Sequence, residues 1–162
     1  MTEKLQEHHC IVAIRIRGTI SALREARETL QMLHLNRNNN GVLIDNRPSF
    51  IGMLRKVQSF ITWGEPTKET LVSLIKKKAR TIGDKKATDE YAVKSGFKSL
   101  DDLAKAVYEC RVTFNDLPDI QPTLRLHPPT KGYKNKIKRS FAAGGESGYR
   151  GDKINELIIR MI

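Results

Sequence analysis

The chain has 162 residues, of which 39% are hydrophobic, and it carries 29 Lys and Arg against 18 Asp and Glu. This is enough apolar material for one core, or for one core with an appendage. A formal net charge of +11 favours nucleic acid over a membrane as the partner, because no apolar run approaches the roughly 20 residues that span a bilayer. No charged-then-apolar signal region opens the chain, so we expect a cytoplasmic protein.

The first strand is predicted over residues 11–17, where Val12, Ile14 and Ile16 alternate with Ala13 and two arginines. Such alternation is typical of a half-buried strand, here with a cationic outer face. Ser21 is placed to cap an amphipathic helix, with apolar residues recurring at helical spacing at Leu23, Ala26, Leu30 and Leu33. An Asn and Gly run over 38–41 ends this helix, and a short buried strand follows at 42–44.

A second helix is predicted after the turn at 45–48, capped by Ser49, with an apolar stripe formed by Phe50, Met53, Leu54 and Val57. Residues 60–63 supply a third strand, which Gly64 and Pro66 end. The order strand, helix, strand, helix, strand is then complete. We therefore predict a core domain over 8–66.

Helical spacing dominates the next segment, which we predict to be a helical extension over 67–119. One helix begins at Thr67, a short one spans 88–94, and Ser99 with Asp102 resembles a capping box before a third. The last segment, 120–162, combines a basic loop with a final amphipathic helix that Asp152 caps. The predicted class is thus α+β, with a helical extension and a basic loop containing Gly and Pro.

The basic loop is the strongest functional signal in the chain. Six Lys and Arg and no Asp or Glu lie between Ile120 and Gly145, interleaved with prolines and glycines that disfavour regular structure. Unbalanced cations repel one another, and a phosphate backbone would supply the missing anions. We therefore predict a polyanion-binding loop that is mobile over 130–148 until RNA binds. The alternative is a solvated loop without a partner.

Signals for catalysis, metals and cofactors are weak. Cys10 and Cys110 are far apart and match neither a zinc spacing nor a disulfide framework, so two reduced thiols are expected. His8, His9 and Cys10 directly precede a strand and cannot all point to one side, which argues against a metal there. The isolated carboxylates, Glu65 included, lack a paired acid or base. We predict no catalytic residue, metal or cofactor.

The segment GGESGYRG at 144–151 lacks the Lys and Ser or Thr of a phosphate-binding loop. Its glycines could let the backbone approach RNA, with Tyr149 stacking and Arg150 contacting phosphate. A flexible hinge before the last helix is the alternative.

Four blocks of the sequence resemble one family over nearly the whole chain and in the same order: VAIRIRG (12–18), GMLRKVQSFITWGEPTKETL (52–71), LRLHPPTKGYK (124–134) and GGESGYRGDKINELIIRMI (144–162). They are similar to the large-subunit ribosomal protein called L-thirty in bacteria and archaea and L-seven in eukaryotes. The length resembles the archaeal form, since bacterial members end near the position of Glu65. After the paired prolines this chain has Thr130, Lys131 and Gly132, where the family commonly has an Arg and two glycines.

The resemblance implies a three-stranded sheet with two helices on one face, related to the ferredoxin-like arrangement. It implies a structural role in the large ribosomal subunit, with large-subunit rRNA near the 5S rRNA region and neighbouring large-subunit proteins as partners. An RNA-modifying enzyme and a basic DNA-binding or chromatin protein are the alternatives. The residues predicted to contact RNA are Arg15, Arg17, Arg47, Arg55, Lys56, Arg125, His127, Lys131, Tyr133, Lys134, Lys136, Lys138, Arg139, Tyr149 and Arg150.

Overall fold

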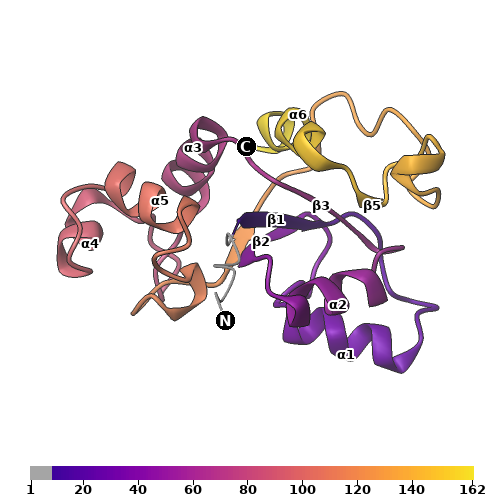
Figure 1. Ribbon diagram of the computed structural model, residues 1–162, viewed down its shortest axis with the longest axis horizontal. Coiled ribbons are helices and arrows are strands. Elements are labelled where there is room, and N and C mark those ends of the chain that lie inside the picture. Colours follow the sequence, from indigo (N-terminus) through magenta and orange to yellow (C-terminus); the bar gives the residue numbers. More distant parts are fainter. Residues whose placement is uncertain (1–8) are drawn as a thin grey trace, which may run out of the picture.

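The computed structural model describes residues 9–162, and its centre is a mixed sheet in the order β4-β2-β1-β3-β5 (Figure 1). The strands are β1 (Cys10–Arg15), β2 (Asn40–Asp45), β3 (Ile61–Gly64), β4 (Thr123–Arg125) and β5 (Gly148–Tyr149). The three central strands match the predicted ones. The prediction of a three-stranded sheet is wrong, because two edge strands from the C-terminal segment extend it.

The edge strands escaped prediction because β4 has three residues and β5 two, which is too short for a periodic pattern. β4 pairs antiparallel with β2, with Leu124 opposite Gly41. β5 pairs parallel with β3, with Tyr149 opposite Trp63. The two edges of the sheet therefore hold the two ends of the segment that carries the basic loop.

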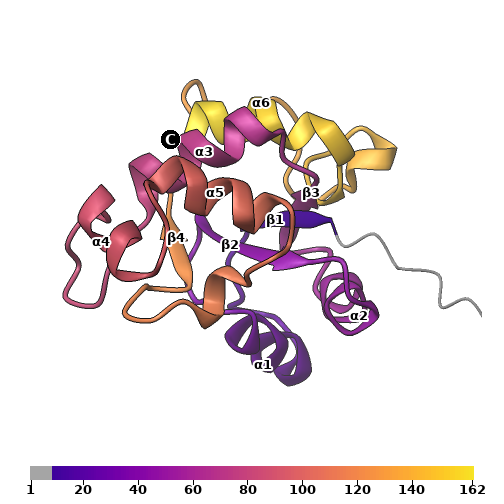
Figure 2. The ribbon, with the colours of Figure 1, turned by 60° about the vertical axis from the view of Figure 1, so that its left-hand side comes forward.

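One face of the sheet is covered by α1 (Arg24–Met32) and α2 (Pro48–Lys56) (Figures 1 and 2). The side chains buried between them include Ile11, Ala13, Val42, Ile44, Ile61 and Trp63 from the strands. Two helices on one face agree with the predicted architecture. The helix starts differ, because α1 begins after Leu23 without a side-chain cap and α2 begins at Pro48, ahead of Ser49.

The opposite face is covered by α3 (Lys68–Lys78), α5 (Leu100–Tyr108) and α6 (Ile154–Met161), while α4 (Asp89–Lys94) packs on α5 (Figure 2). Val12, Ile14 and Ile16 pack there against residues of these helices. All six residues of β1 are buried. The prediction of a half-buried first strand with an exposed cationic face is therefore wrong, because α1 and α2 cover the face that carries Ala13, while the extension covers the face of Val12, Ile14 and Ile16.

Caps and short helices complete the fold. The predicted start of α3 near Thr67 and the predicted cap of α5 at Ser99 are confirmed, since the hydroxyls of Thr67 and Ser99 accept hydrogen bonds from the amides of Thr70 and Asp102. Asp152 instead lies in a short 3-10 helix, η3 (Gly151–Lys153), that leads into α6. Two more such helices are η1 (Phe114–Asp116) and η2 (Phe141–Ala143). Within 9–162, no helix is long and apolar enough to cross a membrane.

Candidate nucleic-acid interface

The basic arm, which we define as residues 126–147 between β4 and β5, presents its cations to solvent. Its Lys and Arg residues are all exposed: Lys131, Lys134, Lys136, Lys138 and Arg139. Lys134 lies 4.0 Å from a carboxylate oxygen of Glu156, and both side chains are largely exposed. Across residues 9–162, the other four form no ion pair. The arm therefore carries charge that the protein itself does not neutralise.

The base of the arm is held by the last helix. The backbone amide of Thr130 donates to the carbonyl of Arg160 at 2.9 Å, and the amide of His127 donates to the carbonyl of Met161 at 3.2 Å. The Arg160 guanidinium in turn donates to the carbonyls of Thr130 and Gly132. These contacts fix the direction in which the arm leaves the body of the protein.

The far end of the arm closes on itself around the carbonyl of Arg139. That oxygen accepts from the amides of Glu146 at 3.0 Å and Ser147 at 3.1 Å. A Cβ on Gly145 would lie 2.0 Å from the same oxygen, so glycine is required there for the close approach of two backbone segments. These bonds give the far end of the arm a defined backbone conformation.

Two apolar side chains anchor the arm to the body. Tyr133 and Ile137 are half-buried and pack against the large core cluster. The Tyr133 hydroxyl lies 3.4 Å from Oδ1 of Asn39, and burial raises the pKa of Tyr133. Ile137, between Lys136 and Lys138, was visible in the sequence, but a single apolar residue in a charged run gives no period that would mark it as an anchor.

A buried ion pair sits beneath the arm. Arg150 Nη2 lies 2.6 Å from Oε2 of Glu146, and the pair's side chains are each 6% exposed. Arg150 Nε also donates to the hydroxyl of Thr62 at 2.8 Å, and its guanidinium lies 4.9 Å from the ring centroid of Phe141. Arg150 thus holds the arm to the sheet from inside. Because the charge of Glu146 is paired with Arg150, it does not offset the arm's exposed cations.

Arg15, also predicted to contact RNA, is 6% exposed. Its guanidinium donates to the carbonyls of Arg17, Leu35 and Asn36 and to the hydroxyl of Thr19, at 2.7 to 3.0 Å. Burial lowers the pKa of Arg15. The side chain points into the protein and joins two loops. Buried backbone carbonyls need hydrogen-bond donors, and Arg15 supplies them to the carbonyls of Leu35 and Asn36.

The remaining predicted residues are exposed or half-exposed but scattered. Arg17 lies over the Phe60 ring at 5.5 Å, and Arg125 lies 3.2 Å from Asp84. Arg47 pairs with Asp45 at 2.5 Å and Lys56 with Glu25 at 3.1 Å, whereas Arg55 is exposed on α2. His127 is exposed, and the Tyr149 hydroxyl donates to Glu65 at 2.9 Å, a bond that raises the pKa of Tyr149.

A second group of cations, absent from the predicted set, lies on the extension. Lys77, Lys85 and Lys86 are exposed at the end of α3 and in the hairpin that follows. Burial, with Arg80 and Lys77 nearby, lowers the pKa of Lys78. The run at 76–80 was visible in the sequence, but a favourable interaction with the helix C-terminus explained it equally well.

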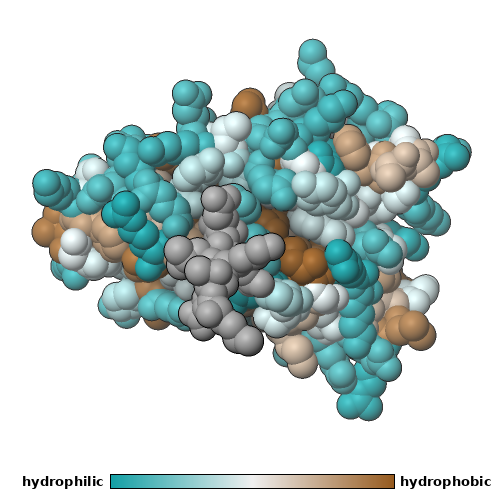
Figure 3. All heavy atoms as spheres, in the orientation of Figure 1, coloured by the Kyte–Doolittle hydropathy of each residue, from teal (hydrophilic) through white to brown (hydrophobic). Residues whose placement is uncertain are grey.

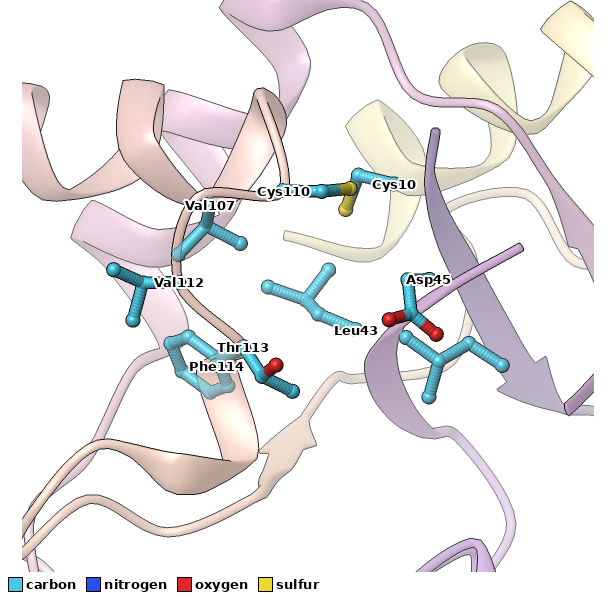
Figure 4. Close-up of a pocket in the computed structure, with 9 residues that line it drawn as sticks. Cys10, Leu43, Asp45, Val107, Cys110, Val112, Thr113 and Phe114 are labelled. Atoms are coloured by element: carbon cyan, nitrogen blue, oxygen red, sulfur yellow. The ribbon is translucent and has the colours of Figure 1, made fainter. Parts of the chain in front are cut away.

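One small pocket has largely apolar walls. Cys10 and Cys110 meet there beside Asp45, with Leu43, Val107 and Phe114 forming the apolar walls (Figure 4). Both cysteines are free thiols, and burial raises the pKa of each. High thiol pKa values oppose nucleophilic reactivity. Among the described residues no group of three His, Cys, Asp or Glu could hold a metal; His8 lies outside them.

The surface around the sheet is largely hydrophilic in the view of Figure 3, with hydrophobic residues in separate spots. Fold and surface together define a basic α+β protein whose exposed, unneutralised cations suit a polyanion. The family model of ribosomal protein L30p/L7e matches residues 11–61.

Curated relatives match over almost their entire length. "Large ribosomal subunit protein uL30" of Methanobrevibacter smithii is 45% identical over 152 residues, covering 93% of this chain and 99% of the relative. The proteins of the same name from Thermofilum pendens and Methanoculleus marisnigri are 43% and 42% identical, covering 93% and 91% of this chain and 97% of each relative. The chain therefore belongs to the L30p/L7e family of ribosomal proteins. It is a structural protein and not an enzyme.

Proposed function

We propose that the protein is a structural constituent of the large ribosomal subunit in the cytoplasm and binds large-subunit rRNA through phosphate contacts made by the basic arm. One observation carries this proposal: the arm's exposed cations have no effective counter-charge within 9–162, while its own carboxylate, Glu146, is buried against Arg150. An RNA backbone supplies one anion per nucleotide, and neutralising it releases counterions.

In this mechanism the arm is folded before RNA arrives. Its hydrogen bonds to α6 and its buried anchors offset, within the protein, much of the conformational entropy that ordering the segment costs. Cations on a prefolded arm then meet phosphates without a further ordering cost. We assign direct RNA contacts to the exposed residues of the predicted set, and a positioning role to Arg15 and Arg150.

The position within the subunit is the finer part of the proposal. The family resemblance supports a site near the 5S rRNA with neighbouring large-subunit proteins in contact. Chemical cross-linking of the protein in intact subunits checks this: cross-links to 5S rRNA or to nucleotides beside it are expected. Cross-links confined to distant rRNA would contradict this position but leave rRNA binding intact.

The salt dependence of RNA binding tests the arm. Alanine at Lys134, Lys136, Lys138 and Arg139 is expected to reduce the slope of log affinity against log salt by about 3, since each lost phosphate contact changes it by roughly 0.7 to 0.9. Lys131 is left in place so that the turn at its positive φ of 65° stays unchanged. Binding to large-subunit rRNA is measured by filter retention over a range of potassium chloride concentrations.

The matched control removes the same charge elsewhere. Alanine at Lys94, Lys98, Lys105 and Arg111, all exposed on the extension, lowers the net charge by the same amount. An equal loss of slope in this control would show that net charge, not the arm, drives binding. Duplex DNA of equal length is tested as a competitor for the rRNA. Equal affinity for duplex DNA and rRNA would favour a general DNA-binding protein over a ribosomal one.

A further inference from the structure

Two loops at one end of the sheet are fastened together by Arg15. The first loop is residues 17–23, between β1 and α1, and the second is the turn 34–39, between α1 and β2. The Arg15 guanidinium bonds Thr19 in the first loop and the carbonyls of Leu35 and Asn36 in the second, at 2.7 to 3.0 Å. The spacing between the loops is therefore set from inside the protein.

The turn 34–39 is also held from its other side. Asn39 donates its amide to the carbonyl of Arg15 at 2.8 Å, and its own carbonyl accepts from Leu126 at the start of the basic arm at 3.1 Å. The Thr123 hydroxyl bonds the carbonyl of His34 at 3.0 Å, and Leu35 is fully buried. The turn is a rigid platform next to the base of the arm.

Three side chains on this platform form no side-chain hydrogen bond or ion pair with the described part of the protein. Asn36, Arg37 and Asn38 are exposed, and none of their side chains makes a hydrogen bond or ion pair with any residue in 9–162. Turn geometry does not require these asparagines, because the left-handed conformation falls at His34 and Asn39, with φ of 59° and 64°. Two free amides therefore flank a free guanidinium on a fixed backbone.

Arg37 and Asn38 border an open groove whose other wall is the first loop, whereas Asn36 faces a separate hollow beside β4. The groove is lined by Arg15, Gly18, Thr19, Ile20, Arg27, Arg37 and Asn38, without an acidic residue. A Cβ on Gly18 would lie 4.0 Å from Nδ2 of Asn38, so the walls are close, and Gly18 has no positive φ that explains the glycine. Ile20 at the rim is 98% exposed; a hydrophobic spot lies over this loop in Figure 3.

We propose that this groove binds unpaired nucleotides of RNA, with Asn38 bonding a base edge, Arg37 and Arg27 contacting phosphate, and Ile20 packing on a base. This inference rests on the proposed function and adds a second contact whose chemistry differs from that of the arm. An amide carries a donor pair and an acceptor, which complement the edges of bases. In paired A-form RNA the Watson–Crick edges of the bases are occupied and the major groove is too narrow for side chains. A side-chain amide is therefore better suited to bond an unpaired base.

The test compares base protection with backbone protection. Large-subunit rRNA is saturated with protein and probed with dimethyl sulfate, which methylates accessible base edges, and with hydroxyl radicals, which cleave the accessible backbone. For the Asn38→Ala variant, a small set of unpaired bases protected by the unchanged protein is expected to become about fivefold more reactive to dimethyl sulfate, corresponding to about one lost hydrogen bond. Hydroxyl-radical protection should remain.

The control is Gln58→Ala, an exposed amide in the turn after α2 and outside the lining of the groove, which should change neither pattern. Thermal midpoints should agree for all three proteins, since none of these side chains has a partner to lose. Unchanged base protection in the Asn38→Ala variant would overturn the inference, as would bases protected only within helices. A wild-type protein that protects no rRNA at all would contradict the proposed function itself, which keeps the two failures apart.

Discussion

At the scale of single residues, Arg15 and Arg150 were predicted to contact RNA, but both are buried. The two side chains play the same structural role. Arg15 and Arg150 each use their guanidinium donors on protein acceptors, and each joins segments that are distant along the chain. A guanidinium offers five donors in a planar fork, so one side chain can hold several acceptors at once. In a strongly basic chain, charge alone therefore does not distinguish an arginine that contacts RNA from one that forms hydrogen bonds inside the protein.

Replacing Arg150 with Met is expected to destabilise the protein by about 3 to 5 kcal/mol, because it leaves the Glu146 carboxylate buried without its partner. Guanidinium chloride unfolding measures the loss. Adding Glu146→Gln should restore part of it, since the uncompensated charge is then gone. Arg24→Met is the control, because the Arg24–Glu28 pair is exposed and worth less than about 1 kcal/mol. Equal effects at both positions would contradict a special role for the buried pair.

At the scale of elements, the basic arm behaves as a part of the fold and not as a tail. It begins beside β2, crosses the end of α6 and rejoins the sheet beside β3. The sequence predicted a segment that orders only on RNA, because cations, prolines and glycines dominate it. What reverses this expectation is a set of long-range contacts made by few residues: Arg160 at the base, Tyr133 and Ile137 in the middle, Glu146 at the end.

Trypsin cleavage tests this anchoring. Arg160→Ala removes the donors to the carbonyls of Thr130 and Gly132, and a loss of about 1 kcal/mol should open the arm roughly fivefold more often. Cleavage at Lys131 to Arg139 should then accelerate by that factor in the RNA-free protein. Arg111→Ala on the extension is the control. Rapid cleavage of the unchanged protein, at the rate of an unfolded peptide, would restore the earlier picture of a mobile loop.

At the scale of the whole molecule, the sheet is a shared wall between two cores. One core joins it to α1 and α2, and the larger one joins it to α3, α5 and α6. Val12, Ile14 and Leu43 belong to the larger core, so the strands predicted as a separate domain over 8–66 bury one of their two apolar faces against residues 67–162. We propose that the three predicted segments fold as one cooperative unit.

A fragment ending at Pro66 tests this proposal. It would expose an apolar sheet face, at a cost of about 25 cal/mol for each Å² returned to water, and is expected to aggregate or to bind the dye ANS. The full chain should unfold in a single transition by circular dichroism and by tryptophan fluorescence from Trp63. A monomeric fragment with its own sharp transition and no dye binding would instead support an independent core domain.

Local patterns in the sequence determined the three central strands, the order of the main helices and the cationic character of the arm, because period, cap residues and charge are properties of neighbouring residues. Tertiary structure alone decided the edge strands, the burial of both sheet faces, the inward turn of Arg15 and Arg150 and the folded state of the arm. Each of these depends on partners far along the chain, such as Thr62 for Arg150 and Leu35 for Arg15. No local pattern encodes a contact whose two halves become neighbours only after the chain has folded.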